Sequence, residues 1–449
     1  MTTSAGRVLG IDIGGTNIAV AVVDDAGRII TRTRMRTDVS GRDEIVTQLV
    51  TSIESLRGRC GDISAAGIGV AGVVNRKTGY VVDSTNLPLG DTDLGRKLSE
   101  ACGLPVVVDN DVTLATLGEA WYGAAQGVSD VVGIFIGTGI GGGLVLDGEL
   151  YGGAHGAAGE VGHMLMDPAG PVCPCGRVGC FEALASRTAV ERDIGRAVEA
   201  GRACSLAEVA RSGQRIRSGL IAQALDEGDP VVTEIMAGVA RVIGEGAASV
   251  ANLIDPDMVV LGGGLIEACG GRIMPTILEA ARARLIEVPG GPVPIVASQL
   301  GNDAGIMGAA AMAQAAVESR RPGGPSAYTP QIEWIGEGEV QINGQRHVED
   351  LVTRADGSMH RRRRKLSRRV HGNPHVVSAE EVEYVCRGNP RPSTVIVGSG
   401  TEGRMALGQD ACAWLEKQGI RAVCLPSMRA VSEYRVTRGP RALLLHLRD

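Results

Sequence analysis

The stretch from residue 156 to residue 186 holds the side chains best suited to bind a metal ion. The four candidate ligands are His163, Cys173, Cys175 and Cys180. One imidazole and three thiolates suit Zn²⁺, and four protein ligands make a closed, tetrahedral, structural site. Glycines 176 and 179 predict tight turns that bring the thiolates together. The alternative is a chance grouping of small apolar residues. A closed site leaves no position for substrate, so the metal would instead hold the neighbouring carboxylates of Glu160 and Glu182 in place.

Two glycine-rich turns have the composition of phosphate-binding loops. Residues 8–24 predict two strands joined by a turn at 14–17, whose backbone amides could face a phosphate. The segment GIDIGGTNIAVAVVDD returns as GIFIGTGIGGGLVLDG, identical at six of sixteen positions, with its turn at 137–139. We interpret this as an internal duplication that gives two related sheets, whose turns could together clamp the phosphates of a nucleotide. Either turn alone could also be a plain hairpin.

Acidic and glycine residues stand where other predicted strands end. Asp12 lies at the inner end of the first strand, where a carboxylate suits the hydration shell of Mg²⁺. A strand over 105–108 leads into a helix that begins near Asp111, which is then either a functional acid or only the N-cap. A predicted strand from residue 255 ends in the glycines at 262–264, which suit either a flat adenosine or a tight turn.

The elements that must position these residues alternate between strands and helices, which indicates an α/β fold. We expect a strand over 67–74, a helix over 230–253 interrupted at Gly244 and Gly246, and a last helix from Asn302 to Ala316. The expected division is an N-terminal lobe over 1–112 with a helix at 303–319 packing back on it, a second lobe over 113–302, a linker over 320–330 and a small α/β domain over 331–449.

Composition and charge narrow the class of protein. The 449 residues include only 2 Phe, 6 Tyr and 3 Trp, so stacking platforms for nucleic acid are scarce. No secretory signal or membrane span is expected, so the 10 Cys are interpreted as reduced thiols and metal ligands of a cytoplasmic protein. Residues 321–449 carry 20 Lys and Arg against 14 Asp and Glu, whereas residues 1–320 carry 25 against 37. This asymmetry predicts two separately evolved units.

Residues 8 to about 317 resemble the ROK family of repressors, open reading frames and kinases, and within it the bacterial ATP-dependent glucokinases. The resemblance rests on the motifs DIGGTN, DND, GTGIGGG, GEVGH with CPCGRVGCFE, and VVLGGG. It implies an actin-like, ribonuclease-H-like fold of two lobes with a cleft between them, and a homo-oligomer, either a dimer or a tetramer. It also implies phosphorylation of an aldohexose by ATP with Mg²⁺, with glucose as the expected substrate. Polyphosphate is left open as an alternative donor.

The same resemblance assigns roles to individual residues. Asp111 is expected to be the general base that takes the proton from the sugar hydroxyl, and Asp12 is expected at the Mg²⁺ position. The expected sugar ligands are Asn86, Asn110, Glu160, His163 and Glu182. The expected phosphate loops are Gly14, Gly15, Thr16, Gly137, Thr138 and Gly139, and the adenosine contact is Gly262, Gly263 and Gly264. The zinc ligands are the four residues named above. Departures from the family pattern at Thr113, Pro174 and Phe181 bear on sugar preference and leave the base and the zinc ligands in place.

Two alternatives to an enzyme come from the same resemblance. ROK repressors carry a helix-turn-helix before the first phosphate loop, and here seven residues precede Val8, so DNA binding is not expected. A non-catalytic scaffold acting through the C-terminal domain is the other alternative.

Residues 331–449 resemble the small domain family of the adipogenesis-associated protein and a mitochondrial complex I assembly factor, through VIVGSGTEGRMAL and RALLLHL. This resemblance implies a compact Rossmann-like α/β domain of poorly defined role. The basic run at 358–369 predicts a solvated face more than a nucleic-acid site. The G-x-G-x-x-G at 398–403 would suit a dinucleotide, but the next strand ends in Leu425 where an acidic ribose ligand is needed.

Overall fold

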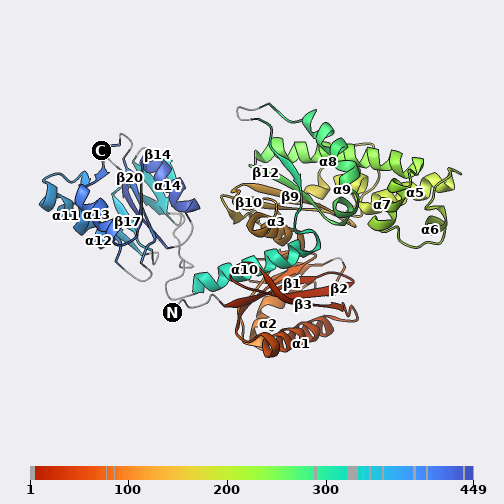
Figure 1. Cartoon of the computed structure of the whole chain (residues 1–449), viewed down its shortest axis with the longest axis horizontal. Helices are drawn as coiled ribbons and strands as arrows, with labels where there is room; N and C mark the ends of the chain where they lie inside the picture. Colours follow the sequence, from red (N-terminus) through yellow and green to blue (C-terminus); the bar gives the residue numbers. More distant parts are fainter. Residues whose placement is uncertain are drawn as a thin grey trace. The chain divides into compact units, whose positions relative to one another are not determined.

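Two five-stranded sheets with the same strand order form the framework of the N-terminal unit, Met1–Gln314, in the computed structural model (Figure 1). The second unit is Ala315–Asp449. The structure describes residues 6–76, 78–84, 86–287, 291–320, 332–336, 338–342, 345–355, 358–387, 391–400, 403–437 and 440–447. The linker expected over 320–330 lies outside the described residues, apart from residue 320.

The first sheet has the order β3-β2-β1-β4-β8. Its strands are β1 (Arg7–Ile13), β2 (Asn17–Val23), β3 (Ile29–Arg36), β4 (Ile63–Val70) and β8 (Val106–Asn110). β1, β2 and β3 pair antiparallel, and β4 and β8 continue the sheet in parallel with β1. The short strands β5 (Val73–Asn75), β6 (Tyr80–Asp83) and β7 (Thr92–Asp93) form a separate small sheet.

The second sheet repeats this pattern in the order β11-β10-β9-β12-β13. Its strands are β9 (Val131–Ile136), β10 (Ile140–Leu146), β11 (Glu149–Leu150), β12 (Met258–Gly262) and β13 (Ile295–Ala297). β9 and β10 form an antiparallel hairpin as β1 and β2 do, and β12 and β13 extend it in parallel as β4 and β8 do. The sequence repeat is therefore also a repeat of topology, and each glycine turn occupies the same place in its sheet.

Helices cover both sheets and also lie between them (Figure 1). α1 (Arg42–Cys60) and α2 (Leu94–Cys102) bury their apolar sides with the first sheet, and α8 (Pro230–Ile254) and α9 (Gly264–Arg282) do so with the second. The remaining helices of the second lobe are α4 (Phe181–Ala185), α5 (Arg187–Glu199), α6 (Ala207–Arg211), α7 (Ser218–Asp226) and the 3-10 turns Val161–His163 and Gly301–Asp303.

Two helices cross in the space between the sheets: α3 (Asp111–Tyr122) and α10 (Ala304–Arg320). α3 packs mainly on β9 and β10, which belong to the sheet that it does not follow directly. α10 also approaches the first sheet, because Cβ atoms on Gly10 of β1 and Gly67 of β4 would overlap carbonyl oxygens of α10. At the crossing, a Cβ on Gly308 would overlap the carbonyl oxygen of Leu114, and one on Gly118 would overlap that of Ala304. Glycine is required here because the backbones touch. The division into lobes at residues 1–112 and 113–302 stays a prediction.

Two expectations about these elements were wrong. The strand over 67–74 is broken, because β4 ends at Val70 and β5 begins at Val73, with Gly72 between them at φ 153°. The helix over 230–253 is continuous as α8, and its glycines do not interrupt it. They allow close packing instead, because a Cβ on Gly244 would overlap the carbonyl of Ile277 in α9 and one on Gly246 would lie 2.7 Å from the Phe181 ring.

The C-terminal unit is built on a mixed sheet of order β18-β17-β23-β20-β22. Its strands and helices are β17 (Leu351–Thr353), β18 (Met359–Arg361), β20 (Thr394–Ser399), β22 (Arg421–Leu425), β23 (Arg441–His446), α11 (Arg364–His371), α12 (Ala379–Val385), α13 (Gln409–Lys417) and α14 (Ser427–Val436). Smaller sheets consist of β14 (Ile332–Gly336), β15 (Glu339–Ile342) and β16 (Gln345–His347), and of β19 (Val376–Val377) with β21 (Ala406–Leu407). No described helix has the length and apolar character needed to cross a bilayer.

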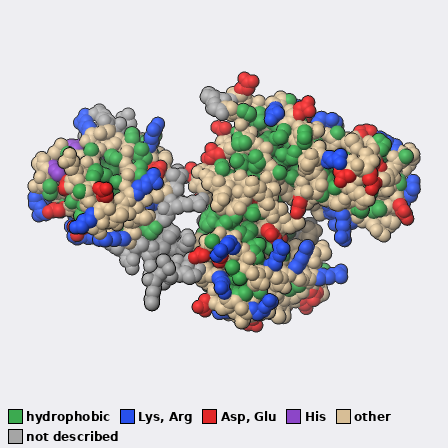
Figure 2. Space-filling view, in the orientation of Figure 1, with side chains coloured by type: hydrophobic (Ala, Val, Ile, Leu, Met, Phe, Trp, Pro, Cys, Tyr) green, Lys and Arg blue, Asp and Glu red, His purple; other side chains and the backbone are tan. Residues whose placement is uncertain are grey.

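The basic run at 358–369 is mostly exposed, as the sequence predicted, although Arg362 is buried and several of the arginines have partners within the unit. Arg361 pairs with Glu349, Arg362 with Asp350 and Glu381, Arg364 with Asp350, Arg369 with Glu380, and Arg363 stacks on Tyr384. Figure 2 shows Lys and Arg side chains spread over the visible face of this unit.

Candidate active site

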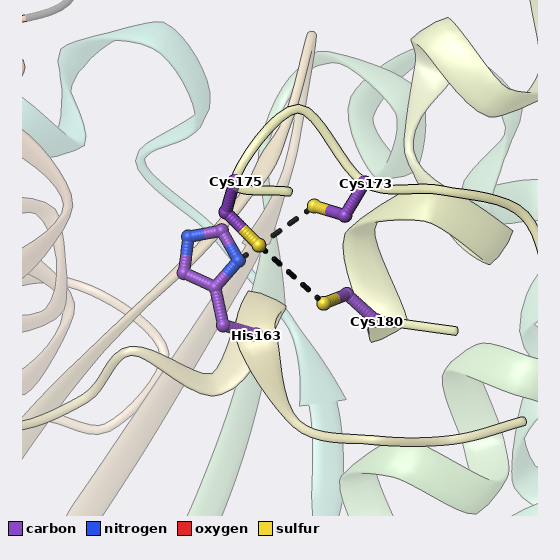
Figure 3. A group of neighbouring side chains, drawn as sticks. All are labelled: His163, Cys173, Cys175 and Cys180. Atoms are coloured by element: carbon purple, nitrogen blue, oxygen red, sulfur yellow. Dashed lines mark hydrogen bonds between the residues drawn. The ribbon is translucent and has the colours of Figure 1, made fainter. Parts of the chain in front are cut away.

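The predicted metal ligands converge on one point (Figure 3). Ligand atoms of His163, Cys173, Cys175 and Cys180 all lie within 4.8 Å of one another. Cys173 Sγ lies 3.8 Å from His163 Nδ1, and the sulfurs of Cys175 and Cys180 are 3.7 Å apart. Tetrahedral Zn²⁺ with Zn–S distances of about 2.3 Å sets its ligand atoms about 3.8 Å apart, so the four residues fit this ion. That they bind zinc stays a prediction.

The cysteine loop is shaped by turns that its sequence encodes. Gly176 and Gly179 adopt φ values of 86° and 72°, which side chains other than glycine rarely tolerate. A hydrogen bond from the Arg177 amide lowers the pKa of Cys175 to about 6, whereas burial raises the pKa of Cys173 to about 12. Cys180 then precedes α4, which carries Glu182 in its first turn.

Glu182 joins this cluster to the second glycine turn. One carboxylate oxygen accepts a 2.9 Å hydrogen bond from the Ile140 amide, and the other lies 3.9 Å from Cys173 Sγ. A Cβ on Gly139 would overlap the carboxylate, so a side chain there would displace Glu182 from the turn. The residue expected to bind sugar therefore also anchors the predicted phosphate loop at residues 137–139.

His163 presents its two ring nitrogens to different partners. Nδ1 faces the cysteine cluster, and Nε2 lies 4.0 Å from a carboxylate oxygen of Glu160. The side chain of Glu160 is 58% exposed, so its carboxylate remains available to a ligand. This arrangement suits a histidine that binds metal on one side and faces substrate on the other.

Asp111 occupies the first position of α3, and it is not the N-cap. That place belongs to Asn110, whose side-chain oxygen accepts hydrogen bonds from the amides of Val112 and Thr113 at 2.9 and 3.0 Å. The Asn110 side-chain nitrogen donates to the Gly72 carbonyl, so much of its expected sugar-binding capacity is used within the fold. Burial raises the pKa of Asp111, and the charge of Glu160 raises it further.

Asp12 stands close enough to Asp111 for the two charges to interact. Burial, and then the charge of Asp111, raise the pKa of Asp12 to about 7, against a lowering by Arg34. A Cβ on Gly305 would lie 3.5 Å from Asp12 Cγ, so this carboxylate sits beside the first turn of α10. Two carboxylates that oppose each other's ionisation suit a divalent cation, and Asp12 therefore fits the expected Mg²⁺ position.

The first glycine turn is closed by backbone hydrogen bonds and faces Asn86. The Gly14 amide donates to the Asn17 carbonyl at 3.0 Å, and the Thr37 hydroxyl donates to the Gly14 carbonyl at 2.7 Å. A Cβ on Gly15 would lie 3.5 Å from Asn86 Cβ, which brings the expected sugar ligand beside the expected phosphate loop of Gly14, Gly15 and Thr16.

The second glycine turn is supported by residues that sequence reasoning missed. Arg187 donates to the Thr138 hydroxyl at 2.7 Å, and the Thr188 hydroxyl donates to the Thr138 carbonyl at 2.7 Å. Both residues begin α5 directly after its N-cap Ser186. A serine N-cap followed by Arg-Thr was a usable signal, because a helix N-terminus next to a glycine turn favours phosphate.

The third glycine group borders a cavity of about 660 Å³. Its walls include Gly262, Gly263, Glu267 and Ser298. The expected tight turn is confirmed, since Gly263 has φ 86° and a Cβ there would lie 2.6 Å from the Ile136 carbonyl oxygen, and the adenosine contact stays a prediction. Gly264 begins α9 and is not among the lining residues. The cavity is large enough for a nucleoside, although its role stays a prediction.

The comparisons with known proteins agree with this architecture. The profile of the ROK family matches residues 8–316, and the profile of a protein of unknown function (DUF498/DUF598) matches residues 332–443. The resemblance of the tail to the adipogenesis-associated family stays a prediction.

Three similar proteins show what kind of molecule the N-terminal unit resembles. A glucokinase from Streptomyces coelicolor is 36% identical over 316 residues, which cover 69% of this chain and 98% of the relative. An N-acetylmannosamine kinase from Salmonella typhi is 34% identical over 316 residues, covering 68% and 98%. The crystal structure of a ROK family glucokinase from Streptomyces griseus in complex with glucose and AMPPNP matches with a TM-score of 0.61 and 35% identity, covering 69% and 99%. The actin-like fold predicted from the sequence is thereby confirmed.

Proposed function

The chain belongs to the ROK family, and on this premise we propose that it transfers the γ-phosphoryl group of ATP to an aldohexose, with glucose as the expected substrate. Its class of activity, a sugar kinase, agrees with similar proteins named glucokinase and N-acetylmannosamine kinase. The proposal rests on one observation: Asp111, Glu160 and His163 lie close together. Glu182, which contacts the same cysteine cluster as His163, holds the second glycine turn through the Ile140 amide.

Asp111 is the proposed general base. Phosphoryl transfer through a loose transition state requires mainly alignment and charge neutralisation, and the sugar hydroxyl loses its proton late. A carboxylate with a raised pKa accepts that proton more readily than an ordinary one, and its place at the first turn of α3 keeps it aligned. We assign the proton of the attacking hydroxyl to an Asp111 carboxylate oxygen.

The two glycine turns are the proposed phosphate ligands. Their backbone amides bind phosphate oxygens without bringing a side chain between protein and nucleotide. Asp12 would hold Mg²⁺, which neutralises phosphate charge when it is bound. The cavity beside Gly262 and Gly263 is the proposed place for adenosine, and ATP is the expected donor because a similar glucokinase was crystallised with AMPPNP.

Sugar selection is the proposed role of Asn86, Glu160, His163 and Glu182, with a smaller part for Asn110. Polar groups that bond to sugar hydroxyls reject a sugar that leaves them unpaired. His163, Cys173, Cys175 and Cys180 would hold Zn²⁺, which fixes the positions of Glu160 and Glu182 relative to Asp111. Glucose is favoured over N-acetylmannosamine because the relative named glucokinase has the slightly higher identity.

The test is sugar-dependent ADP release by the purified full chain with Mg-ATP. The sugars are glucose, mannose, fructose, N-acetylglucosamine and N-acetylmannosamine, and polyphosphate replaces ATP in a parallel series that measures glucose 6-phosphate. We expect glucose with ATP to give the highest kcat/KM. A higher kcat/KM for N-acetylmannosamine would overturn the glucose assignment and leave the kinase class intact. No sugar-dependent reaction above an Asp111→Asn background would overturn the enzyme and favour the regulator or scaffold alternatives.

A further inference from the structure

A cluster of histidine, arginine and aspartate lies at the end of the central strands of the C-terminal unit. β20 and β23 run parallel, and Ser399 pairs with His446 at their carboxyl ends. His375 immediately precedes β19, and its carbonyl accepts a 2.9 Å hydrogen bond from the Ala406 amide at the start of the parallel strand β21, two residues after Arg404. Ligands of α/β sheets commonly bind outside the carboxyl ends of parallel strands.

The inner layer of the cluster is an ion network centred on Asp350. Its carboxylate accepts from His446 Nδ1 at 2.9 Å, from Arg364 Nε at 2.9 Å and from the Leu447 amide at 3.0 Å. Arg362, whose side chain is 0% exposed, bonds to Asp350 at 3.2 Å and to Glu381 at 3.0 Å. The bond to Asp350 places a proton on His446 Nδ1.

The outer layer contains His375, whose ring receives no hydrogen bond from this network. The His375 ring stands edge-on to the His446 ring, with centroids 5.1 Å apart. His375 Nδ1 is buried, and it has no hydrogen-bond partner among the described residues. A buried polar atom without a partner is unfavourable and marks a place that a ligand or a water fills. Arg404 is exposed, and its charge acts on the His375 ring, so the cluster is open to solvent on this side.

The charge around His375 selects an anion. His446, Arg362, Arg364 and Arg404 all act, after burial, to lower the pKa of His375, so their positive potential converges on this ring. The guanidinium groups of Arg362, Arg364 and Arg404 outnumber the carboxylates of Asp350 and Glu381, so the charge of the cluster disfavours a metal cation. Among the described residues the grouping able to hold a metal is the His163 cluster of the N-terminal unit. A dinucleotide is also disfavoured, because β21 and not a helix follows the glycine loop at 398–403, and α13 begins only at Gln409.

We propose that this cluster binds the phosphate group of a small molecule, with His375 and Arg404 as the ligands and the Asp350–His446 pair supporting them. Arginine forms charge-assisted hydrogen bonds to phosphate, and a neutral histidine can donate one more. All residues of this site belong to the C-terminal unit, and the proposal does not rest on the kinase activity.

Histidine ring NMR spectra of the full chain, titrated with inorganic phosphate, test the proposal. The chain has 7 histidines, so a His375→Gln spectrum identifies the His375 signals, and His163 reports separately on phosphate in the N-terminal unit. We expect the signals of His375 and His446 to shift and saturate. Arg404→Ala should raise the phosphate Kd about tenfold or more, the effect of one lost charge-assisted hydrogen bond.

Lys417→Ala is the matched control, because it removes one exposed positive charge at the far end of α13. It should leave the phosphate Kd unchanged. Acetate should shift the two histidines only weakly, and an acetate Kd equal to that of phosphate would overturn the phosphate assignment. Phosphate that moves neither His375 nor His446, or that moves them identically in Arg404→Ala, would overturn the site.

Discussion

Asp111 is subject to opposing influences on its charge, and their balance sets the pH dependence of the proposed reaction. Burial raises its pKa, and Glu160 adds to this, while the amide of Val112 acts in the opposite direction. A general base works only when it is deprotonated, so kcat/KM should rise as pH rises through the pKa of Asp111. Because that pKa is raised, the acid limb should lie above the ordinary range of an aspartate.

Substitution of Glu160 tests whether its charge contributes to the raised pKa of Asp111. Glu160→Gln removes a neighbouring negative charge, so the acid limb of kcat/KM should move to lower pH. Initial rates over the acid range measure it, with Glu54→Gln on the exposed side of α1 as the control. An acid limb at the same pH in Glu160→Gln and in the unsubstituted protein would show that Glu160 does not act on Asp111.

The cysteine cluster predicts that zinc binding depends on each of its thiols. The purified chain should contain about one Zn²⁺, and Cys175→Ser should lose it because a closed site needs all four ligands. The sugar KM should then rise, since Glu160 and Glu182 flank the cluster. Metal analysis and steady-state kinetics measure the two effects. Cys412→Ser is the matched control, because Cys412 is exposed like Cys175 and lies outside the cluster. Freshly purified protein without metal would refute the zinc prediction.

At the level of residues, local patterns were predictable and distant partners were not. The convergence of His163 with three cysteines followed from spacing and from two glycine turns within one short loop. The capping role of Asn110 was missed because Asp, Asn and Asp at successive positions are all good caps. The partners of Arg362 were also missed, because Glu381 and Asp350 reach it only through the fold.

The alignment of the site depends on the crossing of α3 and α10. α3 carries Asp111, and the first turn of α10 lies beside Asp12. Gly308→Ala would force a methyl group against the Leu114 carbonyl, so the free energy of unfolding should fall by about 1–3 kcal/mol. Gly195→Ala in α5 meets nothing within 4 Å and should be neutral or stabilising. Urea unfolding of both variants measures the difference, and equal stability would mean that the crossing relaxes at little cost.

Elements were predictable where a hairpin or a helix start is encoded locally, as in β1 with β2, β9 with β10, and α3. They were not predictable where a glycine serves packing between elements. Gly244 and Gly246 looked like breaks in α8, although they allow contact with α9 and Phe181. Glycine costs helix stability in isolation, and only the neighbouring helix explains why that cost is accepted.

The whole chain consists of two units with separate hydrophobic cores. Residues such as Ile134 and Val239 belong to the core of the second lobe, whereas Val395 and Leu444 belong to a core made within the C-terminal unit. We therefore expect two transitions in thermal unfolding. Glucose with AMPPNP should raise the Tm of only one, because a ligand stabilises the unit that binds it. Calorimetry measures this, and a single transition that shifts as a whole would contradict it.

The most direct test of the central claim compares kcat on glucose for the unsubstituted chain and for Asp111→Asn. Asn keeps the size of the side chain and cannot accept the hydroxyl proton, so kcat should fall about 10²–10⁴-fold. The sugar KM and the Tm should stay close to those of the unsubstituted chain. A kcat within a few-fold of the unsubstituted value would contradict the assignment of Asp111 as the general base.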